Sequence, residues 1–432
     1  MLPMIISTVI FVACLVLIFS ERLNRTIASL AGAILMVGAG LVFKFMDEDQ
    51  AVASLDVNTL GLLLGMMILV SILEPTGFFQ YLAVRVTKLS RGRPVRLLIL
   101  LGGITTVVSM VLDNVTTVVL IAPVTILICE ILGVNPLPYL MAEALLSNTG
   151  GVATLVGDPP NILIGSAANL TFLDFLTHSL PIVVLAWFAA LGILFYLYRR
   201  ELAQKPTNLD AVADLNPAEA LRDPRTARRA LIVIAITILF FLLEEFLNLR
   251  PALVALAGAA GGLVWTRPPI QETLKRVQWD VLLFFAALFV MIGGMRSAGV
   301  FDVFMNLATH LGTMPPLLLG LILLWFVAVL SAVVDNVPIT IALIPVIQNL
   351  GDAGLNITPL WWALVFGAGF GGNGTIIGST ANMIVTSLSE RTRHPITPRL
   401  WSRRGLPVML GTVLVASLCY LVLFELLSRP TP

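Results

Sequence analysis

The sequence predicts an all-α polytopic membrane protein built from two inverted repeats, with about ten transmembrane helices, two re-entrant hairpins and two broken helices. Three observations support this fold class. Apolar side chains make up 58% of the 432 residues and charged side chains only 12%, which is more apolar surface than a water-soluble core can bury. Long uncharged runs alternate with short basic loops, and polar motifs recur at a nearly constant separation.

Each predicted span is an apolar run of about the 20 residues that cross the hydrocarbon core of a bilayer. Basic loops mark the cytoplasmic side of a membrane protein, so the spans are placed to bring these loops to one side. In the first half the spans lie at about 2–20, 26–45, 58–84, 139–170 and 179–198, with a hairpin at 97–132. In the second half they lie at about 230–247, 252–265, 279–296, 359–388 and 405–427, with a hairpin at 315–350. This assignment predicts a multi-pass protein of the cytoplasmic (inner) membrane with both termini outside.

The domain organisation follows from the same pattern. Residues 1–198 form the first repeat, residues 230–432 form the second, and the polar, proline-containing stretch 199–229 is the predicted cytoplasmic linker. No basic residue precedes the first apolar run, so that run is expected to stay as the first helix rather than to be removed as a signal peptide.

Composition also excludes several classes of function. The net charge is only +1, and the Lys and Arg residues are dispersed over short loops, so no basic stripe for nucleic acid is expected. The three cysteines and three histidines are scattered, which predicts neither a metal site nor a cofactor. The chain lacks a Walker-type phosphate loop and a His-Glu-x-x-His motif, so neither ATP hydrolysis nor a membrane-embedded hydrolase is expected. The expected protein is not an enzyme, and its apolar composition predicts that lipid surrounds it.

An internal repeat supports the two-half organisation. Asp113-Asn114 and Asp335-Asn336 lie 222 residues apart in matching apolar surroundings. A second set of matches has a separation of 221 residues: Gly150-Gly151 with Gly371-Gly372, Thr154 with Thr375, and Asn161 with Asn382. Because each half crosses the membrane an odd number of times, the second half is predicted to be upside down relative to the first. Inverted repeats of this kind are typical of alternating-access transporters, whose site lies at the repeat interface near the membrane midplane.

The two Asp-Asn pairs are predicted at the tips of the re-entrant hairpins. An ionisable group at that depth costs at least about 2.5 kcal/mol on insertion scales and usually marks an ion or substrate path. The alternative is that Asp113 and Asp335 only cap the helices that follow them, and one residue can serve both purposes.

The second set of matches predicts two helices that break inside the membrane. Pro159 and Pro160 prevent a regular helix in the first of them, and irregular backbone is tolerated there only beside protein or a wet cavity. The second lacks these prolines, and Ser379 stands where the first has Asp158. We expect Asp113 and Asp335, and then Asp158, to couple transport to protons or ions. The predicted substrate-binding residues are Asn114, Asn336, Thr154, Thr375, Asn161, Asn382, Gly150, Gly151, Gly371, Gly372, Asn148 and Asn373.

Other charges lie near the predicted spans. Glu74 and Arg296 occupy matching repeat positions, which suggests an ion pair between them, although either side chain could instead extend to the membrane surface. Arg296 is the one arginine that the sequence places where it could bind an anion.

These motifs resemble those of the ion transporter superfamily, in the group that joins arsenite permeases, one class of sodium/proton antiporters and the pink-eyed-dilution P proteins. The strings that carry the resemblance are Asp113-Asn114-Val115-Thr116-Thr117, Gly157-Asp158-Pro159-Pro160-Asn161, Asp335-Asn336-Val337-Pro338 and Gly372-Asn373-Gly374-Thr375. The resemblance implies a scaffold domain and a moving transport domain that holds both hairpins and both broken helices. It also implies a homodimer and, in some members, a separate ATPase subunit.

The function expected from these features is secondary active transport. The first hypothesis is efflux of arsenite or antimonite in exchange for protons, because a neutral metalloid oxyacid needs hydrogen-bond donors and acceptors rather than a charge partner. Burial generally raises the pKa of a carboxyl group, which suits a proton-coupling role. The alternatives are sodium/proton antiport and transport of chloride or a carboxylate anion.

Overall fold

The computed structural model describes residues 1–19, 23–204, 206–208, 216–301 and 314–429, and all regular elements in this part of the chain are helices. Seven helical stretches are long and apolar enough to cross a membrane: Arg25–Phe43, Val57–Thr76, Asn114–Leu132, Phe172–Leu197, Trp279–Ser297, Pro316–Val333 and Pro398–Val422. Three shorter apolar helices accompany them, at Leu2–Ile18, Pro94–Ser109 and Pro251–Thr266. The predicted all-α membrane fold is confirmed.

Helices of the first half follow the predicted order. They are α1 (Leu2–Phe19), α2 (Arg25–Phe43), α3 (Glu48–Ala53), α4 (Val57–Leu73), α5 (Phe78–Ser90), α6 (Pro94–Ser109), α7 (Asn114–Leu132), α8 (Leu137–Gly151), α9 (Pro159–Ala168), α10 (Phe172–Asp174) and α11 (Leu180–Leu197). A short π-helical turn at Phe175–Ser179 joins α10 to α11.

Helices of the second half repeat much of this order. They are α13 (Pro217–Ala220), α14 (Pro224–Leu242), α15 (Glu244–Leu247), α16 (Pro251–Thr266), α17 (Ile270–Arg276), α18 (Trp279–Ser297), α20 (Pro316–Val333), α21 (Asn336–Asp352), α22 (Thr358–Gly371), α23 (Thr380–Ser389), α24 (Pro398–Val422) and α25 (Phe424–Leu427). The predicted linker 199–229 lies partly outside the described residues, and its role as a boundary between repeats stays a prediction.

One predicted span has the wrong end. The sequence suggested a single span over 58–84, but α4 ends at Leu73, a 3-10 turn covers Glu74–Thr76 and α5 begins at Phe78. Gly77 lies between them with a φ of +79°, a left-handed conformation that favours glycine. A side chain there would also collide with the backbone carbonyl of Ala220, so glycine is the residue that fits this turn between α4 and α5.

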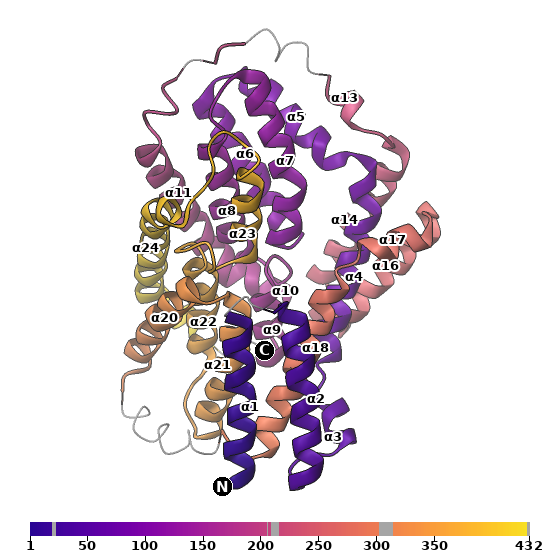
Figure 1. The fold of residues 1–432 in the computed structure, drawn as a ribbon, viewed down its shortest axis with the longest axis vertical. Coiled ribbons are helices and arrows are strands. Elements are labelled where there is room, and N and C mark those ends of the chain that lie inside the picture. The colour runs from indigo at the N-terminus through magenta and orange to yellow at the C-terminus, as the bar shows by residue number, and fades with distance from the viewer. Residues whose placement is uncertain (20–22, 205, 209–215, 302–313, 430–432) are drawn as a thin grey trace.

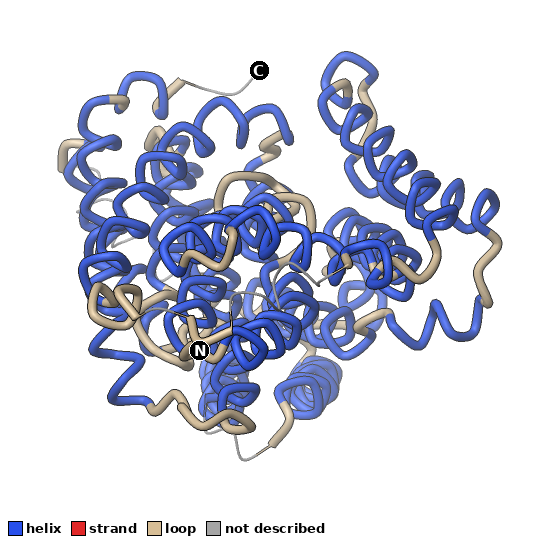
Figure 2. The backbone as a smooth tube through the Cα atoms, turned by 90° about the horizontal axis from the view of Figure 1, so that it is seen from above, coloured by secondary structure: helices blue, strands red, loops and turns tan. Residues whose placement is uncertain are grey.

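The helices pack in groups whose members come from both halves of the chain, and Figure 1 shows their arrangement. In one group, α2 packs against α18 and α4 packs against α16. In the other, α6 packs against α8, α20 against α22, and α11 against α24. The bundle seen from above consists of helices and their connecting loops (Figure 2). The tips of the pairs α6–α7 and α20–α21 both point toward the interior, as expected for re-entrant hairpins.

Candidate functional site

Both predicted broken helices are broken, and the same bonds hold each break. The first lies between α8 and α9, where the Asn161 amide nitrogen donates to the carbonyls of Gly151 (3.0 Å) and Thr154 (2.8 Å). The second lies between α22 and α23, where the Asn382 amide nitrogen donates to the carbonyls of Gly372 (2.7 Å) and Thr375 (2.8 Å). Carbonyls released by a break inside a membrane need such partners, because no water reaches them from the lipid.

Each break is also fastened to the neighbouring hairpin tip. The Thr154 hydroxyl donates to the carbonyl of Met110 on the first tip, and the Thr375 hydroxyl donates to that of Ala332 on the second. Thr154 and Thr375, both predicted binding residues, therefore donate their hydroxyl protons to backbone carbonyls. These bonds shape the site by fixing each tip against its break.

Glycines allow the backbone segments at each break to approach each other closely. A Cβ on Gly157 would lie 2.5 Å from the Gly151 carbonyl oxygen and 2.7 Å from that of Ser109. A Cβ on Gly378 would meet the equivalent atoms, the carbonyl oxygens of Gly372 and Ser331, at 2.7 and 2.8 Å. The predicted site glycines face them: a Cβ on Gly151 would lie 2.7 Å from the Gly157 carbonyl oxygen, and one on Gly372 would lie 2.8 Å from that of Gly378. Gly151 and Gly372 thus serve close backbone packing, which only a residue without a side chain permits.

The two hairpin tips meet at a small cavity. Asp113 caps α7 by accepting from the Thr116 backbone N–H at 2.8 Å and from the Thr116 hydroxyl at 2.6 Å. Asp335 caps α21 by accepting from the Val337 backbone N–H at 3.0 Å. Both also line the cavity, whose volume is about 40 Å³. Capping and site lining therefore coexist, and the cavity is close to the size of a single water molecule.

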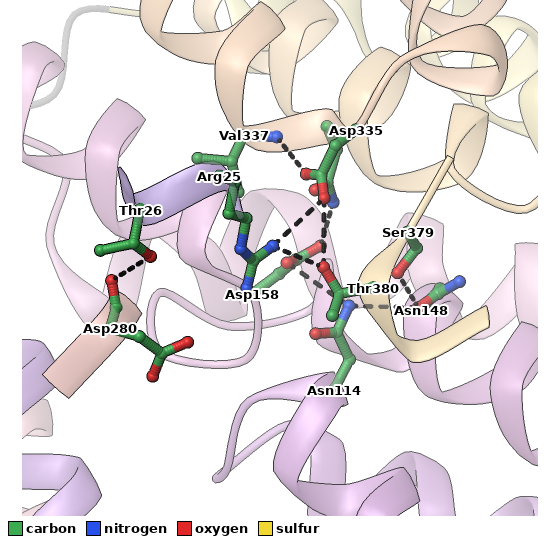
Figure 3. Close-up of polar contacts among 11 residues, drawn as sticks. Arg25, Thr26, Asn114, Asn148, Asp158, Asp280, Asp335, Val337, Ser379 and Thr380 are labelled. Carbon is green, nitrogen blue, oxygen red and sulfur yellow. Dashed lines mark hydrogen bonds and ion pairs between the residues drawn. The ribbon is translucent and has the colours of Figure 1, made fainter. Parts of the chain in front are cut away.

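Asp158 lies between the two tips and is buried. Its Oδ2 accepts from the Asn336 amide at 3.1 Å, and its Oδ1 accepts from the Asn114 amide at 3.5 Å (Figure 3). Asp158 lies in extended backbone directly before α9. The first break thus directs one carboxylate toward an asparagine from each repeat.

Asn148 connects the two repeats behind this carboxylate. Its amide nitrogen donates to the side-chain oxygens of Asn382 (2.9 Å) and Asn373 (3.1 Å). Its oxygen accepts from the Asn114 amide (3.1 Å) and the Ser379 hydroxyl (3.0 Å). The structure therefore brings six of the predicted site residues into one buried network: Asn114, Asn148, Asp158, Asn336, Asn373 and Asn382.

The repeat is not perfect at this point. Positions 148 and 373 correspond to positions 369 and 152 of the opposite repeat, where the chain has Gly369 and Val152. Val152 packs directly onto Gly369, since a Cβ on Gly369 would lie 2.2 Å from a Val152 methyl carbon. One pair of equivalent positions is thus joined by amides and the other by apolar contact.

Arg25 is a site residue that the sequence did not reveal. It begins α2, yet its Nη1 lies 2.9 Å from the Thr380 hydroxyl and 3.6 Å from Asp335 Oδ2. On the other tip, the Gln278 amide donates to the Thr116 hydroxyl at 3.0 Å. The loop position of Arg25 predicted only a cytoplasmic charge, and no motif distinguishes it from the other loop arginines.

The suggested ion pair between Glu74 and Arg296 is wrong. Glu74 pairs instead with Arg276 at 3.0 Å, and Arg296 donates to Gln348 at 2.6 Å. Each of the two side chains therefore has a partner other than the one that the repeat suggested. Among the described residues, no cluster of His, Cys, Asp or Glu could hold a metal ion.

A helical membrane protein in which two hairpin tips and two broken helices enclose a buried polar site is a secondary transporter. Residues 15–367 match the family model described as citrate transporter. The chain belongs to this family.

Known relatives agree with that assignment. The chain is 40% identical over 420 residues to a protein of Mycobacterium tuberculosis (strain ATCC 25618 / H37Rv) named an uncharacterised transporter, which covers 96% of this chain and 98% of the relative. It is 31% identical to the human P protein, over 96% of this chain and 59% of that protein. The predicted resemblance to the P-protein group is thus confirmed.

A solved structure supports the fold. The crystal structure of the YdaH transporter of Alcanivorax borkumensis, described as having an unusual topology, matches with a TM-score of 0.62. The match covers 94% of this chain and 99% of that one at 17% sequence identity, so the likeness concerns the fold alone.

Proposed function

We propose that this transporter is proton-coupled and that Asp158 carries the coupling charge. The observation that supports this is the position of Asp158, buried between the hairpin tips with two neutral amide donors, and with no cation among its described contacts. Burying a charged carboxylate without a cation costs of the order of several kcal/mol, and binding a proton removes that cost. Asp113 and Asp335, expected to come first, are half-buried helix caps, so Asp158 takes their place as the first candidate.

A proton fits this arrangement better than sodium does. The asparagines on both tips direct their amide nitrogens, not their oxygens, at Asp158. A sodium ion needs several oxygen ligands, and the N–H groups would repel it. Sodium/proton antiport is therefore the less favoured alternative.

The substrate class we infer first is a small carboxylate anion. Arg25 supplies a guanidinium at the cavity, which the sequence alone did not place there, and the family is described as citrate transporter. A cavity of about 40 Å³ is too small for such a solute, so loading requires the tips to move apart.

Efflux of arsenite or antimonite is the second candidate. The amides of Asn114 and Asn336 and the hydroxyls of Ser379 and Thr380 surround the cavity, and they could hydrogen-bond a neutral trihydroxide without any charge partner. Arg25 has no role in binding such a solute, which separates the two candidates.

The test uses purified protein in proteoliposomes with an imposed pH gradient of either direction. Citrate and arsenite are offered in turn, and accumulation is measured with and without a protonophore. We expect gradient-driven accumulation of one solute by the wild type. Asp158→Asn should exchange that solute across the membrane but no longer concentrate it.

A matched control is Asp352→Asn, which removes an exposed carboxylate at the other end of α21 and should keep full gradient-driven accumulation. If Asp158→Asn concentrates the solute as well as the wild type, Asp158 does not couple transport. If a sodium gradient, and not a pH gradient, drives accumulation, the proton assignment is wrong.

A homodimer and a separate ATPase subunit, which the resemblance implies, remain part of the proposal. Accumulation by the purified chain without ATP would mean that an ATPase subunit is not needed for coupled transport.

A further inference from the structure

Arg25 reaches the site from a helix outside the two hairpins. It begins α2, which packs against α18, and its guanidinium lies 5.5 Å from the centre of the Phe284 ring of α18. Contact with an aromatic face at this distance holds a guanidinium in place. Figure 3 shows the Arg25 guanidinium beside Thr380 and Asp335. Phe284 and Thr380 thus keep the charged end of Arg25 at the tip of the second hairpin.

The ion pair that Arg25 makes there is loose. Its Nη1 is 3.6 Å from Asp335 Oδ2, whereas closed charge-assisted hydrogen bonds of this type measure about 2.7 to 2.9 Å. A guanidinium has five N–H donors in a fork that suits a carboxylate, and the described hydrogen bonds use one of them. The described hydrogen bonds thus leave further N–H donors on Arg25, which lines the cavity.

Asp335 presents its carboxylate as a ligand would. Oδ2 accepts from the Thr380 hydroxyl at 3.1 Å and faces Arg25, while Oδ1 caps α21. A carboxylate of a solute would use this same hydroxyl and this same guanidinium. The corresponding acid on the first tip, Asp113, has Thr116 as its described partner and no cation.

We propose that Arg25 is the anion-recognition residue of this transport site and that the Asp335 carboxylate occupies it in the empty carrier. The solute anion and Asp335 then compete for one guanidinium. Removing the charge on Asp335 by substitution releases Arg25 for the solute. This inference rests on the proposed function and names the residue that would select an anion over a neutral oxyacid.

The competition requires that Asp335→Asn strengthen anion binding. Asparagine can still cap α21 through its side-chain oxygen, so the hairpin tip keeps its shape, but the negative charge beside Arg25 is gone. Arg25→Gln should weaken binding, and Arg25→Lys should also weaken it, because an ammonium cannot form the forked pair.

The experiment measures binding of radiolabelled citrate, at one fixed pH, to the full chain in lipid nanodiscs. Variants are Asp335→Asn, Arg25→Gln, Arg25→Lys and the double variant Arg25→Gln/Asp335→Asn. Arg276→Gln is the matched control, because Arg276 makes an ion pair of 3.0 Å with Glu74 away from the cavity. Gel filtration and thermal melting check that each variant is folded.

We expect Asp335→Asn to bind citrate at least tenfold more tightly than the wild type, and both Arg25 variants to bind it at least tenfold more weakly. The double variant should bind as weakly as Arg25→Gln, since the gain depends on Arg25, and Arg276→Gln should match the wild type. Absence of citrate binding to Asp335→Asn, or a gain that persists in the double variant, would overturn the proposal.

Failure of this inference can be distinguished from failure of the proposed function. If Arg25→Gln binds citrate like the wild type while the wild type still concentrates solute on a pH gradient, only the role of Arg25 is wrong. If no pH gradient drives accumulation by the wild type, the proton-coupled function is wrong regardless of the binding data.

Discussion

Replacing Asn148 with alanine tests whether one buried amide joins the two repeats. The side chain makes four hydrogen bonds, two as donor to Asn373 and Asn382 and two as acceptor from Asn114 and Ser379. After the substitution, the side-chain oxygens of Asn373 and Asn382 lose their described partner. The methyl group that remains offers no replacement.

The size of the effect follows from these bonds. Side-chain hydrogen bonds inside membrane proteins contribute about 0.6 kcal/mol each on average, so four of them give roughly 2.4 kcal/mol. Leaving two buried oxygens without donors adds about 1 kcal/mol or more. We therefore expect Asn148→Ala to lower the free energy of unfolding by about 3 to 4 kcal/mol.

The assay is steric trapping or reversible detergent unfolding of the protein in bicelles. The control is Asn58→Ala. The Asn58 side chain makes one described hydrogen bond, in which its oxygen accepts from the Ala252 backbone N–H at 3.2 Å, so the variant should lose about 0.6 kcal/mol. If Asn148→Ala is no less stable than Asn58→Ala, the hydrogen bonds of Asn148 between the two repeats do not stabilise the fold, and the reasoning fails.

Further predictions concern the break, the linker and the topology. Gly157→Ala should abolish transport because its Cβ would lie 2.5 Å from a backbone oxygen, whereas Gly103→Ala, with open space around it, should keep full activity; equal activity would contradict the packing argument. Asp223 caps α14 through Arg225 and Thr226, and hydrogen bonding to Thr226 lowers the pKa of its carboxyl group. Asp223→Ala should therefore cost about 0.5 to 1 kcal/mol at pH 7, and this difference should shrink in melts below about pH 4, because the cap is lost as the wild-type carboxyl is protonated. Reporters active on one side of the membrane should place both termini outside, and a cytoplasmic signal from both would reverse the predicted orientation.

The backbone of the site could be predicted from the sequence because its constraints are local. Pro159 and Pro160 forbid a continuous helix wherever the rest of the chain lies, and repeated Asp-Asn pairs between short apolar arms predict a tip. Similar local signals occur at 74–77, where Pro75 and Gly77 end α4 before the predicted boundary. The predicted span 58–84 was too long because the hydrophobic run continues past this turn.

The partners of the side chains could not be predicted in the same way. Asn148 and Asn161 are the same residue type thirteen positions apart, yet one joins the repeats and the other supports the carbonyls of its own break. Arg25 reaches Asp335 only because α2 packs against α18 and brings its first residue to a hairpin 310 positions away. Tertiary packing determines these distances, and no spacing in the sequence encodes them.

The mismatch between the Asn148–Asn373 pair and the Val152–Gly369 pair has a consequence for the transport cycle. Two identical inverted halves would give the inward-open and outward-open forms equal free energies, because the repeat axis would convert one form into the other. Each unequal pair removes that degeneracy. A difference of only a few kcal/mol leaves the minor form at about 0.1 to 10% of the molecules. The positions at which the two halves differ therefore determine which form the empty carrier favours. Changing such a pair should shift the equilibrium between the inward-open and outward-open forms without changing the contacts with the solute.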